Sequence, residues 1–69
     1  MLSIDKRLNH AAYELIHNTV SEYDGKDGST FAFISGEIHA LFLVNALTPQ
    51  QYQELNSTLE KKFYTYPLI

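Results

Sequence analysis

Hydrophobic and polar positions alternate with the period of an α-helix in the first third of the chain. One stripe is apolar and the opposite stripe is wholly polar, and both recur at steps of three and four residues, as on the faces of a helix. The pattern predicts a helix over about residues 4–23, with Ser3 as its N-cap and Asp5 in its first turn. The apolar stripe consists of Leu8, Ala11, Ala12, Leu15, Ile16, Thr19, Val20 and Tyr23.

Two Asp-Gly pairs, at residues 24–25 and 27–28, predict a loop after this helix. Glycine readily takes the positive backbone angles that end a helix, and aspartate favours turns. The loop matches a calcium-binding loop in composition only. Positions three, five and twelve counted from Asp24 are Lys26, Gly28 and Ser35, which lack the required carboxylates. We therefore expect no calcium site here.

Residues 30–34 fit two interpretations. They alternate and are rich in aromatic and branched side chains, as in a strand, but no second strand pattern exists to pair with them. Read as a helix capped by Ser29 or Thr30, with Ser35 as the alternative start, the segment continues one apolar face. We expect a helix over about residues 30–46. Gly36 then costs about 1 kcal/mol, unless its missing side chain lets another helix approach closely.

Thr48 and Pro49 give the clearest boundary, because threonine can cap a helix and proline suits its first position. The pattern that follows predicts a helix over about residues 49–63, with Lys61 and Lys62 towards water and Pro67 preventing continuation. The short link predicts a hairpin of the last two helices, with the first closing over it. We therefore predict a single all-α domain, a three-helix domain spanning residues 1–69, with an apolar C-terminal tail.

The size of the chain limits its stability, because a domain of 69 residues buries only about 60% of its unfolded surface. There is no cysteine, which excludes disulfides and thiolate metal sites and leaves helix packing and self-association. The formal net charge of −3 disfavours nucleic acid as a partner. No secretion signal or membrane-spanning run is visible, so we expect a cytoplasmic protein, in keeping with a bacterial or phage accessory protein.

One motif has the spacing of metal ligands. Glu14 and His17 form a Glu-x-x-His step, which di-metal helix bundles use, and His10 lies on the same stripe. A metal site would need two copies of the chain, with Glu37 or Glu54 adding ligands. The stripe is polar from end to end, however, which indicates a solvated face. No nucleophile elbow or phosphate loop occurs, so we expect no cofactor and no catalytic site.

A helix-turn-helix-like DNA-binding regulator is the alternative function. The last helix is rich in amides and hydroxyls of the kind that read base edges, but its only neighbouring cations are Lys61 and Lys62. Replacing both lysines with glutamate should abolish such binding. The polar residues in question are Gln50, Gln51, Gln53, Asn56, Ser57 and Thr58.

The apolar ending is the strongest functional signal. If free, its side chains would expose several hundred Å² of apolar surface, on the order of an interaction site. They fold back on the protein's own helices or pack on a second subunit or another protein, where aromatic anchors are favoured. We therefore expect a non-enzymatic protein–protein interaction module that forms a homodimer and binds another protein. The candidate interaction residues are Phe63, Tyr64, Tyr66, Leu68 and Ile69.

Overall fold

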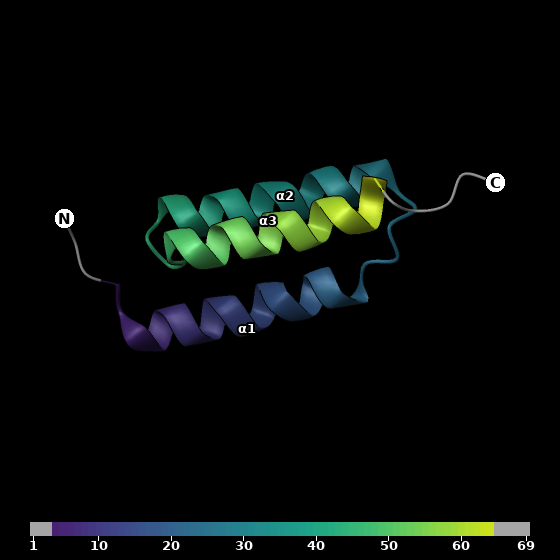
Figure 1. Cartoon of the computed structure of the whole chain (residues 1–69). Coiled ribbons are helices and arrows are strands. Elements are labelled where there is room, and N and C mark those ends of the chain that lie inside the picture. The colour runs from purple at the N-terminus through teal and green to yellow at the C-terminus, as the bar shows by residue number, and fades with distance from the viewer. Residues whose placement is uncertain (1–3, 65–69) are drawn as a thin grey trace.

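Three helices make up the part of the chain that the computed structural model describes, residues 4–64 (Figure 1). They are α1 (Lys6–Glu22), α2 (Gly28–Leu43) and α3 (Pro49–Tyr64). Helices that follow one another in sequence run antiparallel, and α1 packs against both members of the α2–α3 hairpin, so that α1 and α3 are parallel (Figure 1). The predicted all-α three-helix domain is confirmed. Residues 30–34 lie inside α2, and no strand occurs between residues 4 and 64.

The first two helices begin at aspartates that the sequence pattern did not single out as caps. Asp5 accepts hydrogen bonds from the backbone N–H groups of Arg7 and Leu8, at 2.9 and 3.1 Å. The N-cap of α1 is therefore Asp5 and not Ser3, and the helix begins two residues later than predicted. Likewise Asp27 caps α2, so the predicted caps Ser29 and Thr30 lie inside its first turn. At each cap the carboxylate accepts from backbone N–H groups of the first turn, and its negative charge complements the helix dipole.

The Asp27 cap makes the fold sensitive to acid. Its carboxylate accepts hydrogen bonds from the Thr30 hydroxyl and from the backbone N–H groups of Ser29 and Thr30. These bonds, the one from the Thr30 hydroxyl foremost, lower the pKa of Asp27 because they favour the ionised form. The cap contributes its full stability above the pKa that Asp27 has in the unfolded chain, about 4. This contribution is lost as the pH falls through the lower pKa that Asp27 has in the folded chain.

We expect Asp27→Asn to reduce this loss of stability in acid, because asparagine still caps a helix but does not titrate. Urea unfolding at pH 7 and at pH 3 gives the loss of free energy between the two pH values. That loss should be smaller in the variant than in the unmodified protein. An equal loss in both proteins would show that Asp27 contributes nothing to the acid sensitivity.

The end of α2 was predicted wrongly. The helix stops at Leu43, three residues before the expected end, because Asn45 takes a left-handed backbone conformation with φ of 63°. The N–H of Asn45 bonds to the carbonyl of Phe42 at 3.0 Å, and that of Ala46 bonds to the carbonyl of Leu41 at 2.8 Å. This pair of bonds is the Schellman motif, in which asparagine can replace glycine.

The start of α3 was predicted correctly, and the structure adds a link to α1. The Thr48 hydroxyl accepts from the N–H of Gln51 at 3.0 Å, and the Gln51 side chain accepts from the N–H of Thr48 at 2.9 Å, which is a capping box before Pro49. Asn9 of α1 donates to Gln51 Oε1 at 2.7 Å and to the carbonyl of Ala46 at 2.9 Å. The beginning of α1 is thereby fixed to the α2–α3 corner.

The core lies between the three helices and uses only part of the apolar stripe of α1. Leu8 and Leu15, which belong to that stripe, are 49% and 66% exposed. Two neighbouring helices cover only a limited arc of α1, so the edge of a broad stripe remains outside. The buried residues are Ala12, Ile16, Val20, Tyr23, Ile34, Ile38, Ala46, Leu47, Leu55 and Leu59.

Candidate interaction surface

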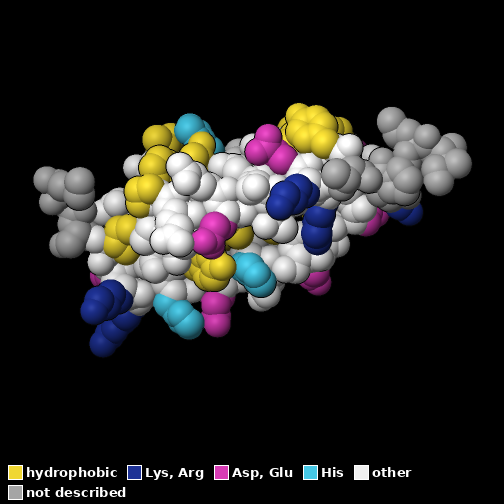
Figure 2. Space-filling model, viewed as in Figure 1, with side chains coloured by type: hydrophobic (Ala, Val, Ile, Leu, Met, Phe, Trp, Pro, Cys, Tyr) yellow, Lys and Arg dark blue, Asp and Glu magenta, His cyan; other side chains and the backbone are white. Residues whose placement is uncertain are grey.

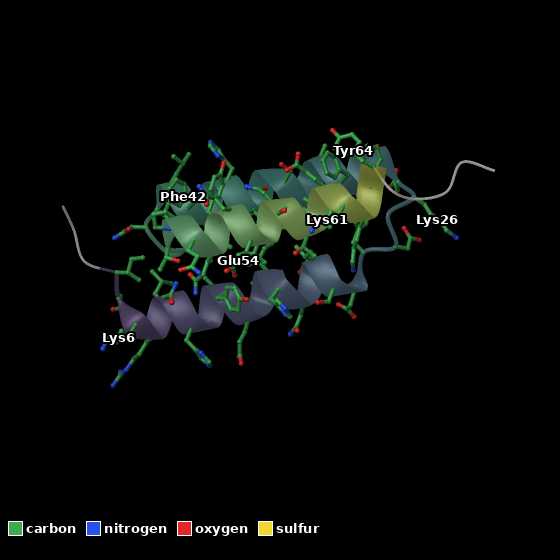
Figure 3. The ribbon with its side chains drawn as sticks, in the orientation of Figure 1. Lys6, Lys26, Phe42, Glu54, Lys61 and Tyr64 are labelled. Atoms are coloured by element: carbon green, nitrogen blue, oxygen red, sulfur yellow. The ribbon has the colours of Figure 1, made fainter. Side chains whose placement is uncertain are left out.

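The end of α3 separates the first two candidate interaction residues into different environments. Phe63 is half-buried and stacks on Phe31 of α2, with ring centroids 4.5 Å apart and an angle of 13° between the planes. Tyr64 is 68% exposed and meets both rings edge-on (Figure 3). Phe63 therefore packs against the core of this chain, whereas the Tyr64 ring lies on the surface.

The remaining candidates, Tyr66, Leu68 and Ile69, lie outside the described residues. Figure 2 shows an exposed hydrophobic group close to lysine and acidic side chains at the same end of the molecule, and Figure 3 identifies Tyr64 there. Within residues 4–64, the C-terminal candidate surface thus consists of the Tyr64 ring and the exposed edges of the aromatic residues beside it.

Lys62 anchors the end of α3 to the end of α1. Its ammonium group donates to the carbonyls of Val20, Ser21 and Tyr23 at 2.8, 2.7 and 3.1 Å. These carbonyls lie at the C-terminus of α1, which has no basic residue in its own last turn. A cation at this position satisfies carbonyls that lack partners within the helix and complements the negative end of the dipole. The prediction that Lys62 points to water is wrong, whereas Lys61 is exposed.

The loop between α1 and α2 passes directly against the same part of α3. Gly25 is buried with φ of 86°, and a Cβ atom at this position would overlap the backbone carbonyl of Lys62. The Tyr23 hydroxyl donates to the carbonyl of Asp27 at 2.7 Å and so closes the loop. Burial, and then the charges of Asp24 and Asp27, raise the pKa of Tyr23. The end of α3 is therefore held both by a side chain and by a close backbone contact.

These contacts bear on the alternative DNA-binding function. Gln51 is engaged in the capping box and with Asn9, and all three N–H donors of Lys62 are directed at carbonyls of α1. Two side chains on which the DNA hypothesis rested are thus used to hold the fold. A test that replaces Lys62 with glutamate would disturb the structure as well as any phosphate contact.

The polar stripe of α1 lies at the surface, as its pattern predicted. His10 and Glu14 approach to 3.4 Å as exposed neighbours one turn apart, and the His17 ring lies 5.5 Å from that of Tyr13. Glu14 and His17 therefore have separate neighbours. Between residues 4 and 64, no group of three His, Asp or Glu side chains is arranged to hold a metal ion.

A second aromatic group lies between α2 and α3 at the opposite end of the hairpin. Phe42 stacks on Tyr52 with ring centroids 4.3 Å apart, and the Tyr52 hydroxyl lies 3.1 Å from Nδ1 of the exposed His39 (Figure 3). Since Phe42 and Tyr52 are only half-buried, this end of the hairpin presents ring edges and one imidazole to solvent.

Large exposed hydrophobic side chains on α1 and α2 are the feature that the sequence pattern missed. Isolated exposed leucines are normal, but contiguous apolar surface marks interaction sites. The available signal was that large apolar side chains occur on every side of α2, among a few polar ones, whereas a helix with one solvated face is apolar on one side only. In the described chain, the large exposed hydrophobic residues are Leu8, Leu15, Phe33, Leu43, Val44 and Tyr64.

Comparison of the chain with protein-family models, with curated proteins and with solved structures finds no match. Of the helices in residues 4–64, none has the length and apolar character needed to cross a membrane.

Proposed function

We propose that this chain is a non-enzymatic protein–protein interaction module of the cytoplasm, which forms a homodimer and binds another protein. One observation carries the proposal: six large hydrophobic side chains in residues 4–64 are between 49% and 68% exposed. Water disfavours such surface by about 25 cal/mol per Å², so covering it with a partner is favourable. The small size of the chain adds to this, since association buries further apolar surface beside a core that is small in one copy.

The C-terminal end is the proposed site for another protein. Tyr64 is exposed there beside the rings of Phe31 and Phe63, and the predicted candidates Tyr66, Leu68 and Ile69 follow it in sequence. Tyrosine suits such a role because its ring contributes apolar contact area while its hydroxyl forms hydrogen bonds.

The proposal is tested by the molar mass of the full chain in solution. We expect light scattering after size-exclusion chromatography to give twice the 7.9 kDa of one chain. A chain without Leu68 and Ile69, measured in parallel, shows whether the last residues contribute to the dimer or are free for another partner. A monomeric mass for the full chain at protein concentrations up to about 1 mM would contradict the homodimer.

A further inference from the structure

We infer that, in the proposed homodimer, the second copy binds to the outer face of the α1–α2 pair. This inference rests on the proposed function, and it places the C-terminal end outside the dimer interface. The central residues of this face are Leu8, Leu15, Phe33, Ala40 and Val44, all of them exposed. The partner is another molecule of the same chain, bound through the same face.

The contacts with α3 define which side of α1 and α2 this face occupies. Phe31 and Phe42 of α2 stack on α3 side chains. Phe33 and Val44 each lie two residues further along, and residues two apart point to nearly opposite sides of a helix. Both side chains are therefore directed away from α3, in agreement with exposures of 68% and 66%.

The same argument applies to α1. Asn9 bonds to Gln51 and so marks the side of α1 that faces α3. Leu8 and Leu15 lie roughly 100–120° around the helix from Asn9, on the edge away from α3. Because α1 and α2 pack side by side, the two edges that avoid α3 adjoin on one side of the pair. Figure 2 views the molecule from the side of α3, so this face lies beyond the view.

The area of the face suits a dimer. Helices of 17 and 16 residues are about 25 Å long, and two of them side by side are about 20 Å wide. The footprint is therefore about 500 Å² per subunit, or about 1,000 Å² for two copies, which reaches the lower limit for a specific interface.

The charge distribution favours an identical copy over a charged partner. Neither α2 nor the part of α1 after Arg7 contains a lysine or an arginine, and helical spacing puts two carboxylates, Glu22 and Glu37, on the stripes that form this face. An acidic partner would therefore have no lysine or arginine to pair with on this face, and a basic partner would have only a few carboxylates. Two copies that each carry a net charge of −3 repel least where their charges are fewest, and each supplies the apolar face that the other lacks.

Gly36 lies at the margin of this face and has no obvious reason to be glycine within one chain. It is in the interior of α2, where glycine costs about 1 kcal/mol relative to alanine. A Cβ atom there would meet nothing within 4 Å among the described residues. The predicted benefit of Gly36, close approach by another helix, is therefore not used inside the chain and is open to the second copy.

Three single substitutions locate the interface in the full-length chain. Phe33→Lys and Leu15→Lys place a cation on the proposed face. Tyr64→Lys is the matched control, because Tyr64 and Phe33 are both 68% exposed but Tyr64 lies at the C-terminal end. We expect the first two variants to raise the dimer dissociation constant by at least about 30-fold in sedimentation equilibrium, and Tyr64→Lys to leave it within about threefold. Unchanged circular dichroism shows that each variant remains folded.

The outcomes separate this inference from the proposed function. If the unmodified chain dimerises and both face variants retain its affinity, the inferred interface is wrong while the interaction module stands. The same holds if only Tyr64→Lys weakens the dimer, since the interface would then lie at the C-terminal end. A monomeric unmodified chain overturns both proposals.

A second measurement needs no substitution. In a mixture of isotope-labelled and unlabelled copies, isotope-filtered NMR detects only contacts between subunits. We expect such contacts at the methyl groups of Val44 and Leu15. Intersubunit contacts that are confined to the aromatic rings at the C-terminal end would overturn the inference.

Discussion

Replacing Gly25 with alanine should lower the free energy of unfolding by about 3 kcal/mol, because two penalties add. The left-handed backbone with φ of 86° costs about 1–2 kcal/mol for a residue with a Cβ atom. The added methyl group also overlaps the backbone carbonyl of Lys62, so the loop or the end of α3 must shift. Thermal unfolding at fixed protein concentration should show a melting temperature lower by roughly 12–24 °C.

Gly28→Ala is the matched control for this prediction. Gly28 lies in the same loop region at the first position of α2, and an added Cβ would meet only the Phe63 ring, at 3.7 Å. Alanine is a better helix former than glycine, so Gly28→Ala should be neutral or slightly stabilising. Equal effects of the two substitutions would show that the contact between Gly25 and Lys62 does not limit stability.

Replacing Lys62 with methionine should cost about 2–3 kcal/mol, because the three carbonyls at the end of α1 lose a charged donor. Methionine keeps most of the aliphatic part of the lysine side chain, so the decrease in stability measures mainly the lost hydrogen bonds. Hydrogen exchange should become faster in the last turn of α1, and urea unfolding should give the lower free energy.

Lys61→Met provides the comparison, since it removes the same charge from the adjacent, exposed position of α3. Exposed surface substitutions usually change stability by less than about 0.5 kcal/mol. If both lysine variants showed the same small decrease in the free energy of unfolding, the ammonium contacts of Lys62 would contribute no more to stability than an exposed charge does.

The candidate interaction site was only partly predictable from sequence. The segment 63–69 stood out because five of its seven residues are aromatic or large aliphatic ones. The helical periodicity placed Phe63 on the apolar face of α3, four residues after Leu59, and in the structure Phe63 stacks on Phe31 whereas Tyr64 is 68% exposed. The sequence did not reveal that Phe33 is exposed. Large apolar side chains occur on every side of α2, so the periodicity does not identify which side faces solvent.

The sequence by itself determined the all-α class, the three helices and the Thr48-Pro49 start of α3, because these depend on local periodicity and capping. Only the tertiary structure decided which edge of the α1 stripe is buried, that Lys62 bonds to the end of α1, and that Gly25 must lack a side chain. These features join residues up to 42 positions apart. They depend on how the helices pack, and no short segment contains that information.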